Sequence, residues 1–81
     1  MNDYFSSWLR KKLIERGMKQ KDIAEALDIS DTAVSHYVNG SWVPTIPNLV
    51  RLCDALDEPD IGMVARLICL DDINKMQRKV S

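Results

Sequence analysis

The chain has 81 residues, which is enough for one small domain and too few for a second hydrophobic core. Apolar residues make up 46% of it and charged residues 28%, the balance of an ordinary soluble globular protein. No apolar run approaches the roughly 18 residues that span a membrane, and the first residues lack a signal-peptide pattern, so we expect a cytoplasmic protein. The two cysteines, Cys53 and Cys69, are too few for a disulfide scaffold and too far apart for a CxxC site.

The charge is unevenly distributed, although the formal net charge is only −1. Residues 1–22 carry six basic and three acidic side chains, whereas residues 23–58 carry one basic and six acidic side chains. The overall balance excludes a strongly cationic coat that binds nucleic acid without selectivity. A polyanion would still be drawn to the first segment. The same Lys and Arg side chains could also simply solvate a helix surface.

Helical spacing of apolar residues recurs along the chain, and no long stretch alternates apolar and polar residues as a strand would. The first apolar stripe, within residues 5–13, ends in front of Gly17, a common helix stop. A second and short stripe lies within residues 23–27. A third, within residues 34–38, is followed by Gly40. Each stripe predicts a helix.

Two further helices are predicted after prolines. The fourth apolar stripe lies within residues 49–56, where Pro44 prevents an earlier start and Thr45 is expected to cap the N-terminus. The fifth helix is expected to begin near Asp60, after Pro59. Helices this short are marginal alone and have to pack on one another. The sequence therefore predicts an all-α domain of five helices.

The third predicted helix, from about Asp31 to Val38, has an unusual polar face. Its apolar residues fall on one side, and the other side has no Lys, Arg or Glu to solvate it. That polar face consists of Asp31, Thr32, Ser35, His36 and Asn39. Only about three residues link this helix to the preceding one, and Ile29 can fill the corner between them. Two short helices joined so tightly describe a helix-turn-helix.

The segment from Leu9 to Leu56 resembles the XRE-type helix-turn-helix domain of phage repressor and Cro proteins. The residues that carry the resemblance follow the family's order without a gap: Arg16-Gly17, Gln20, Ile23-Ala24, Leu27, Ile29-Ser30, Val34-Ser35, Asn39-Gly40, Pro44-Thr45, Leu49, Leu52 and Leu56. The resemblance implies a five-helix, lambda-repressor-like DNA-binding domain with the helix-turn-helix at helices two and three. We expect this domain, fifth helix included, to span residues 1–70, and a C-terminal helical extension or tail to span residues 71–81.

The resemblance also implies which residues meet DNA, because the third helix of this family lies in the major groove and its neighbours hold phosphates. The expected base-contacting residues are Asp31, Thr32, Ala33, Ser35 and His36. The family's phosphate positions fall on Gln20, Ser30 and Asn39. To these we add four polar or basic residues that lie near the same track: Arg10, Lys19, Lys21 and Ser41. Ser30 is also expected to cap the third helix.

Three side chains near this surface have two interpretations each. Asp31 either accepts a hydrogen bond from a cytosine amino group or only favours the helix N-terminus through the helix dipole. His36 either donates to guanine N7 or O6 or faces solvent. Trp42, which follows the third helix, either donates its indole N–H to a phosphate or packs over the loop onto the core.

The chain departs from the family's pattern at several positions. Asp28 stands where the family usually has Gly. Lys19 stands where it usually has Ser or Thr, so the second helix loses a side-chain cap that Asp22 is expected to replace in part. Leu13 and Val38 stand where many members pair a basic with an acidic residue. A hydrophobic contact is expected there instead, a change that can be neutral or stabilising.

The fifth predicted helix is apolar on two sides and therefore needs two partners. One stripe, within residues 61–68, can pack onto the rest of the domain. The other is expected to form a homodimer interface, since an exposed apolar stripe usually marks an association site. It consists of Met63, Leu67, Leu70 and Ile73. Family members commonly dimerise through this helix. The alternative is a helix that is fully buried in its own core.

These patterns predict a sequence-specific regulator that binds double-stranded DNA, specifically a small phage or mobile-element repressor that binds an operator as a dimer. The alternative is a protein-binding helix-turn-helix module, such as an antitoxin whose main partner is a protein, motivated by Trp42-Val43 and the acidic middle segment. We expect no effector domain in 81 residues, so that any control would come from concentration, dimerisation or a regulatory protein partner. One histidine, no metal-ligand cluster and no glycine-rich phosphate loop argue against an enzyme. We expect no cofactor, metal, small-molecule ligand or membrane contact.

Overall fold

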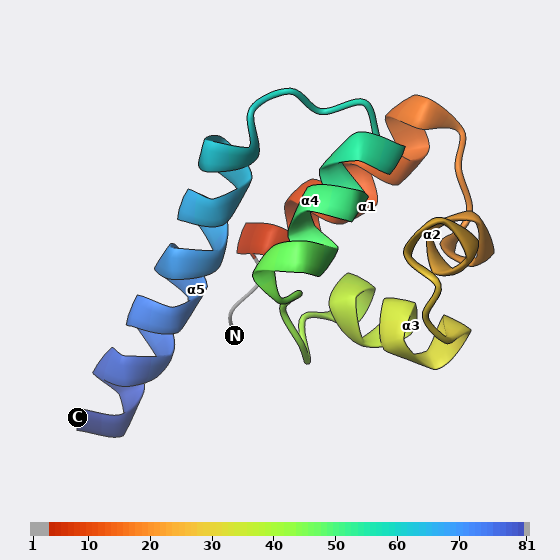
Figure 1. Cartoon of the computed structure of the whole chain (residues 1–81). Coiled ribbons are helices and arrows are strands. Elements are labelled where there is room, and N and C mark those ends of the chain that lie inside the picture. Colours follow the sequence, from red (N-terminus) through yellow and green to blue (C-terminus); the bar gives the residue numbers. More distant parts are fainter. Residues whose placement is uncertain (1–3, 81) are drawn as a thin grey trace.

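The computed structural model describes the backbone of residues 4–80 and the side chains of residues 4–73. It has five helices, which are α1 (Tyr4–Arg16), α2 (Gln20–Leu27), α3 (Asp31–Asn39), α4 (Ile46–Ala55) and α5 (Ile61–Val80) (Figure 1). The described backbone contains no strand, so the predicted all-α fold with five helices is confirmed. Within this part of the chain, no helix is both long enough and apolar enough to cross a membrane.

The helices are arranged so that α1 and α4 separate the helix pair α2–α3 from α5. α1 packs against α3 and α5, whereas α2 packs against α3 and α4, and α4 also contacts α5. Figure 1 shows α2 and α3 on one side of this arrangement and α5 on the other. The helix with the unusual polar face and the helix with the predicted dimer stripe therefore lie far apart.

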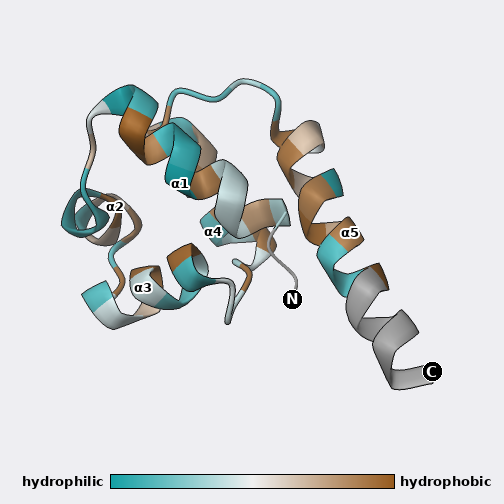
Figure 2. Ribbon diagram, turned by 180° about the vertical axis from the view of Figure 1, so that it is seen from behind, coloured by the Kyte–Doolittle hydropathy of each residue, from teal (hydrophilic) through white to brown (hydrophobic). Residues whose placement is uncertain are grey.

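All five helices contribute apolar residues to one core, which explains why helices of eight to thirteen residues are stable here. Apolar segments are present in every helix of Figure 2. The buried apolar residues are Phe5, Leu9, Leu13, Ile23, Ala24, Leu27, Val34, Tyr37, Leu49, Leu52, Cys53, Leu56 and Val64. Burial, and to a smaller extent the charge of Glu58, raises the pKa of the Cys53 thiol, so this residue stays protonated and acts as a small hydrophobic side chain.

The helix ends follow the predicted capping, with one exception. Ser30 Oγ accepts a hydrogen bond at 3.1 Å from the amide three residues further on, and Asp60 Oδ1 does the same at 3.0 Å at the start of α5. Thr45 occupies the N-cap position of α4, but its side chain makes no capping hydrogen bond, so the expected cap is wrong. Pro47 in the first turn of α4 has no amide hydrogen, and the helix therefore begins with one fewer unsatisfied donor.

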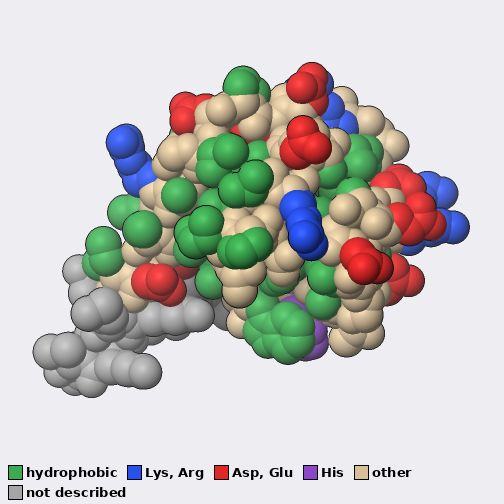
Figure 3. Space-filling view, in the orientation of Figure 1, with side chains coloured by type: hydrophobic (Ala, Val, Ile, Leu, Met, Phe, Trp, Pro, Cys, Tyr) green, Lys and Arg blue, Asp and Glu red, His purple; other side chains and the backbone are tan. Residues whose placement is uncertain are grey.

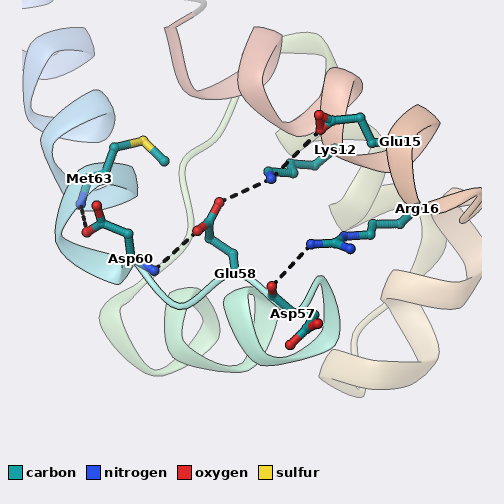
Figure 4. A network of polar contacts seen from close by, with 7 residues as sticks. All are labelled: Lys12, Glu15, Arg16, Asp57, Glu58, Asp60 and Met63. Atoms are coloured by element: carbon teal, nitrogen blue, oxygen red, sulfur yellow. Dashed lines mark hydrogen bonds and ion pairs between the residues drawn. The ribbon is translucent and has the colours of Figure 1, made fainter.

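A polar network fastens the connection between α4 and α5 to α1 (Figure 4). Lys12 Nζ lies 3.3 Å from Glu58 Oε1, and Arg16 Nη2 donates to the backbone carbonyl of Asp57 at 3.3 Å. Glu58 Oε2 also accepts from the backbone amide of Asp60 at 3.2 Å. Part of the basic charge of the first helix thus serves the fold on the side away from α3.

The first turn of α1 is capped by a carboxylate that comes from α5. Asp71 is only 1% exposed, and its two oxygens accept from the backbone amides of Tyr4 at 3.0 Å and Phe5 at 3.1 Å. The first amides of a helix have no partner within the helix, and a negative charge is favoured at that end. Residue 71, which the sequence assigned to a C-terminal extension, therefore packs against the first helix of the domain, and α5 runs through residues 70 and 71 without a break.

We expect Asp71→Asn to lower the free energy of unfolding by about 2 kcal/mol, because the new amide group presents a donor to a buried backbone donor. Asp72 is exposed and provides a matched control, since Asp72→Asn removes the same charge one residue away without affecting the cap. Urea unfolding followed by circular dichroism measures both variants. Equal unfolding free energies for the two would contradict the role of Asp71.

Candidate nucleic-acid interface

The corner between α2 and α3 is a tight turn with a fixed geometry. Asp28 has the left-handed backbone conformation, with φ of 55°, at a position where the family usually has glycine. The amide of Ile29 donates to the Ala24 carbonyl at 3.0 Å, and the Ile29 side chain packs against the core, as the sequence predicted. Ala24, in the second turn of α2, is buried. The turn therefore sets the angle between the two helices.

The predicted base-contacting residues lie on the side of α3 that faces away from the core. Val34 and Tyr37 are buried. The outer side carries the five predicted residues, of which three are exposed and two are half-buried: Asp31, Thr32, Ser35, Ala33 and His36. The structure thus brings these five side chains together on one helix, with short polar groups at its surface.

A hydrogen bond joins this surface to the start of α2. Ser35 Oγ donates to Gln20 Oε1 at 2.9 Å. A predicted base contact and a predicted phosphate contact are therefore neighbours in the structure. Because the amide oxygen of Gln20 is used in this bond, its NH₂ group is the part that can donate to a ligand.

Two exposed lysines flank the same end of α2. Lys19 is the N-cap residue and Lys21 lies in the first turn. A lysine side chain has no acceptor and cannot cap the helix, but Asp22 Oδ2 accepts from the Lys19 backbone amide at 2.8 Å. The expected partial replacement of the cap by Asp22 is confirmed. Lys19 and Lys21 are free of ion pairs among the described side chains.

Asn39 and Ser41 mark the other end of α3. Both residues are exposed, and Asn39 Oδ1 accepts from the backbone amide of Ser41 at 2.9 Å. This bond uses the amide oxygen of Asn39, so its NH₂ group is the part that can donate to a ligand. Of the predicted phosphate contacts, Ser30 thus lies at the start of α3, Asn39 and Ser41 lie at its end, and Gln20 lies beside its middle through Ser35.

Arg10 differs from the other predicted phosphate contacts because its guanidinium already makes two hydrogen bonds within the domain. Its Nη1 donates to the backbone carbonyl of Val38 at 2.7 Å and its Nη2 donates to Ser7 Oγ at 3.2 Å. The guanidinium therefore satisfies a carbonyl in the last turn of α3, where a positive charge is favoured. Leu13 is buried, and Val38 packs against the same core at the position of the replaced ion pair.

Trp42 is the residue that the sequence placed least well. Of its two interpretations, packing onto the core does not match the structure, because the side chain is 50% exposed and is not among those that pack against the core. Its indole instead stacks on the imidazole of His36, with ring centroids 4.0 Å apart and ring planes inclined by 29°. Figure 3 shows the histidine next to a large apolar side chain at the lower edge of the molecule. The sequence carried no signal for this pair, because the loop after α3 brings the two rings together.

Other parts of the described chain offer less to a polyanion. A cavity of about 300 Å³ opens near the end of α4, and its lining includes the carboxylates of Asp54, Asp57 and Glu58. These negative charges would repel a phosphate group. Among the described residues, no group of three or more His, Cys, Asp or Glu side chains could hold a metal ion.

Comparison with known protein families identifies the fold family of the segment that contains α2 and α3. A helix-turn-helix family model matches residues 9–61, which is more than half of the chain and includes α2, the turn and α3. No curated protein and no solved structure matches the chain.

We expect Asp28→Gly to raise the free energy of unfolding by about 1 kcal/mol, because glycine adopts the left-handed conformation without the steric cost that a side chain pays. Asp54, an exposed residue in the last turn of α4, is the matched control, and Asp54→Gly should destabilise by about 0.3 kcal/mol. Thermal and urea unfolding compare the two variants. A destabilised Asp28→Gly protein would mean that the Asp28 side chain supports the turn.

Proposed function

The chain belongs to the XRE-type helix-turn-helix family of DNA-binding regulators, and we propose that it recognises a specific double-stranded DNA operator by placing α3 in the major groove. The observation that carries this proposal is the outer face of α3. It presents short polar side chains on a helix whose opposite side is held in the core, and it adjoins two unpaired lysines at the start of α2. A solvated helix face would carry long charged side chains instead.

Base recognition is proposed for the exposed N-terminal half of α3 and for His36. The methyl groups of Thr32 and Ala33 suit the methyl group of thymine, and the Thr32 hydroxyl suits either kind of base. His36 suits guanine N7 or O6 as a donor. Asp31 is placed in the first turn of α3, where its charge favours the helix N-terminus and where it could also accept from a cytosine amino group. Ser35 contributes mainly through its bond to Gln20.

Phosphate contacts are proposed at the start of α2 and at both ends of α3, where they would meet the two backbone strands that border a groove. Gln20, Lys19 and Lys21 would hold one strand from the start of α2, together with Ser30. Asn39 and Ser41 would hold the other from the end of α3. Contacts of this kind fix the position of the protein and carry no sequence information. Arg10 positions α3 through the Val38 carbonyl and keeps further N–H donors for a phosphate.

A homodimer formed through α5 completes the proposal. Met63 and Leu67 are half-buried, whereas Leu70 is 38% and Ile73 is 47% exposed. Figure 3 shows apolar side chains gathered over α4 and the first part of α5. Because α3 lies on the other side of α1 and α4, a contact through α5 leaves both copies of α3 uncovered. A two-fold dimer would place them about 34 Å apart, on half-sites roughly 10 base pairs apart.

Such a dimer would act as a small repressor of the phage or mobile-element type, by occupying its operator. A second candidate is a protein-binding module such as an antitoxin, which the half-exposed Trp42 beside Val43 favours. The two candidates differ in one measurable property, which is selectivity among DNA duplexes.

Selection of bound duplexes from a random pool should yield one enriched operator sequence. Replacing Thr32 and His36 together by alanine should then lower the affinity for that operator by about 100-fold, because each base contact contributes about 1–3 kcal/mol. Binding to unrelated duplexes should stay the same, since neither side chain is proposed to hold a phosphate. Fluorescence anisotropy with labelled duplexes measures both affinities, and circular dichroism checks the fold.

Arg51→Ala is the control for this test, since Arg51 is exposed on α4 outside the proposed surface, and it should leave operator selectivity unchanged. Tight binding to a co-encoded protein, with no enriched duplex, would sink the DNA proposal and support the antitoxin candidate.

Leu70→Asp combined with Ile73→Asp should convert a dimer into a monomer, because the charges would enter the proposed interface. Ile14→Asp is the matched control, since Ile14 is 81% exposed on α1 and has no place in that interface. Sedimentation at high micromolar concentration measures the oligomeric state. A wild-type chain that sediments as a monomer there would contradict the dimer.

A further inference from the structure

We propose that Trp42 is a positioning residue for base recognition and that it fixes the imidazole of His36 before DNA is bound. This inference rests on the proposed function, and it assigns to the loop after α3 a role in sequence selectivity. It starts from the stacked pair of rings and from the hydrogen bonds that bring them together.

The loop is fastened to the same residue whose ring it covers. The backbone amides of Ser41 and Trp42 both donate to the His36 carbonyl, at 2.9 Å and 3.2 Å. Gly40 makes this turn accessible, because its φ of 86° lies in the region that favours glycine. These bonds hold the backbone of Trp42 just beyond the end of α3, and its side chain lies over the imidazole of His36.

The stack restricts the imidazole to one plane. The ring centroids are only 4.0 Å apart and the ring planes are inclined by 29°, so the two rings are in close stacked contact. His36 Nδ1 is buried and has no hydrogen-bond partner in the structure. The stack fixes the plane of the imidazole, and because Nδ1 is buried, Nε2 is the ring nitrogen that can bond to a base.

A fixed ring matters on this surface because selectivity depends on geometry. Ordering a free side chain at an interface costs about 0.5–1.5 kcal/mol in the bound state, and a ring ordered in advance avoids that cost. A ring held in one orientation also meets only one arrangement of base edges correctly. Loss of the stack should therefore weaken the distinction between right and wrong bases.

Trp42 could instead act directly, since half of its side chain is exposed and its indole N–H could donate to a phosphate. The two roles give different results. A phosphate donor raises the affinity for every duplex, whereas a positioning residue acts on one base pair and only through His36. Trp42→Phe separates them, because phenylalanine keeps a ring for stacking and lacks the N–H donor.

The experiment measures affinities of the intact chain for the selected operator and for its single-base-pair variants. Trp42→Ala should reduce the affinity ratio between the right and wrong base, at the pair that His36→Ala also affects, by about 2- to 10-fold. The same change in a His36→Ala background should leave that ratio unaltered, and Trp42→Phe should preserve it. Circular dichroism checks that each variant is folded.

Nuclear magnetic resonance tests the stack in the free protein. His36 is the single histidine, so its two ring protons give one identifiable pair of signals. The indole should shift these signals upfield in the wild type, and Trp42→Ala should remove the shift. An unshifted imidazole, or an unchanged base ratio in Trp42→Ala, would overturn the inference while leaving the proposed function intact. So would an equal loss of affinity for all duplexes in both Trp42 variants. Failure to enrich any duplex would remove the proposed function and this inference together.

Discussion

The burial of one side of α3 is the constraint on which its outer surface depends. A helix of nine residues is marginal by itself, so its shape and position come from packing. Val34 is fully buried and Tyr37 is 6% exposed, and full burial of a large apolar side chain contributes about 1.5–3 kcal/mol. Arg10 adds a polar attachment at the last turn through the Val38 carbonyl. The outer side chains are free to serve recognition because they contribute little to holding the helix.

α5 connects the domain to the surface through which we propose that it dimerises. Val64 and Asp71 lie on its buried side, and Asp71 caps α1. Leu70 and Ile73 lie on its exposed side. The buried carboxylate of Asp71 is tolerated because two backbone amides donate hydrogen bonds to it. The orientation of the exposed stripe is therefore fixed relative to α1, and through α1 relative to α3.

The sequence predicted the helices well because their signals are local. Apolar spacing located all five helices, Ser30 capped α3 as expected, and Asp22 replaced part of the lost cap of α2. The contacts that were missed join residues far apart in the chain or depend on a loop. Nothing near Asp71 in the sequence marks it as the cap of a helix 67 residues earlier.

The exposed surface of α3 was also predicted from a local signal in the sequence. Its helical period determines which residues share a face, and burial follows that period. Three contacts were not predicted: the hydrogen bond of Ser35 to Gln20, that of Arg10 to the Val38 carbonyl, and the stack of Trp42 on His36. They depend on how α1, α2 and the loop after α3 pack against α3. The helical spacing of residues in the sequence does not predict such contacts. Side-chain roles are therefore less predictable here than side-chain positions.

The shortage of positive charge on α3 links the proposed dimer to the proposed role of Trp42. Phosphate contacts supply most of the sequence-independent affinity of a DNA-binding protein, and here they are limited to the edges of the surface. A single domain with few cations would bind weakly, whereas two domains joined in one dimer bind cooperatively, because the second contact becomes intramolecular. The remaining selectivity has to come from uncharged groups, whose hydrogen bonds depend strongly on distance and angle. A side chain such as His36 then needs a fixed orientation, and the indole beside it is the group in the structure that can provide one.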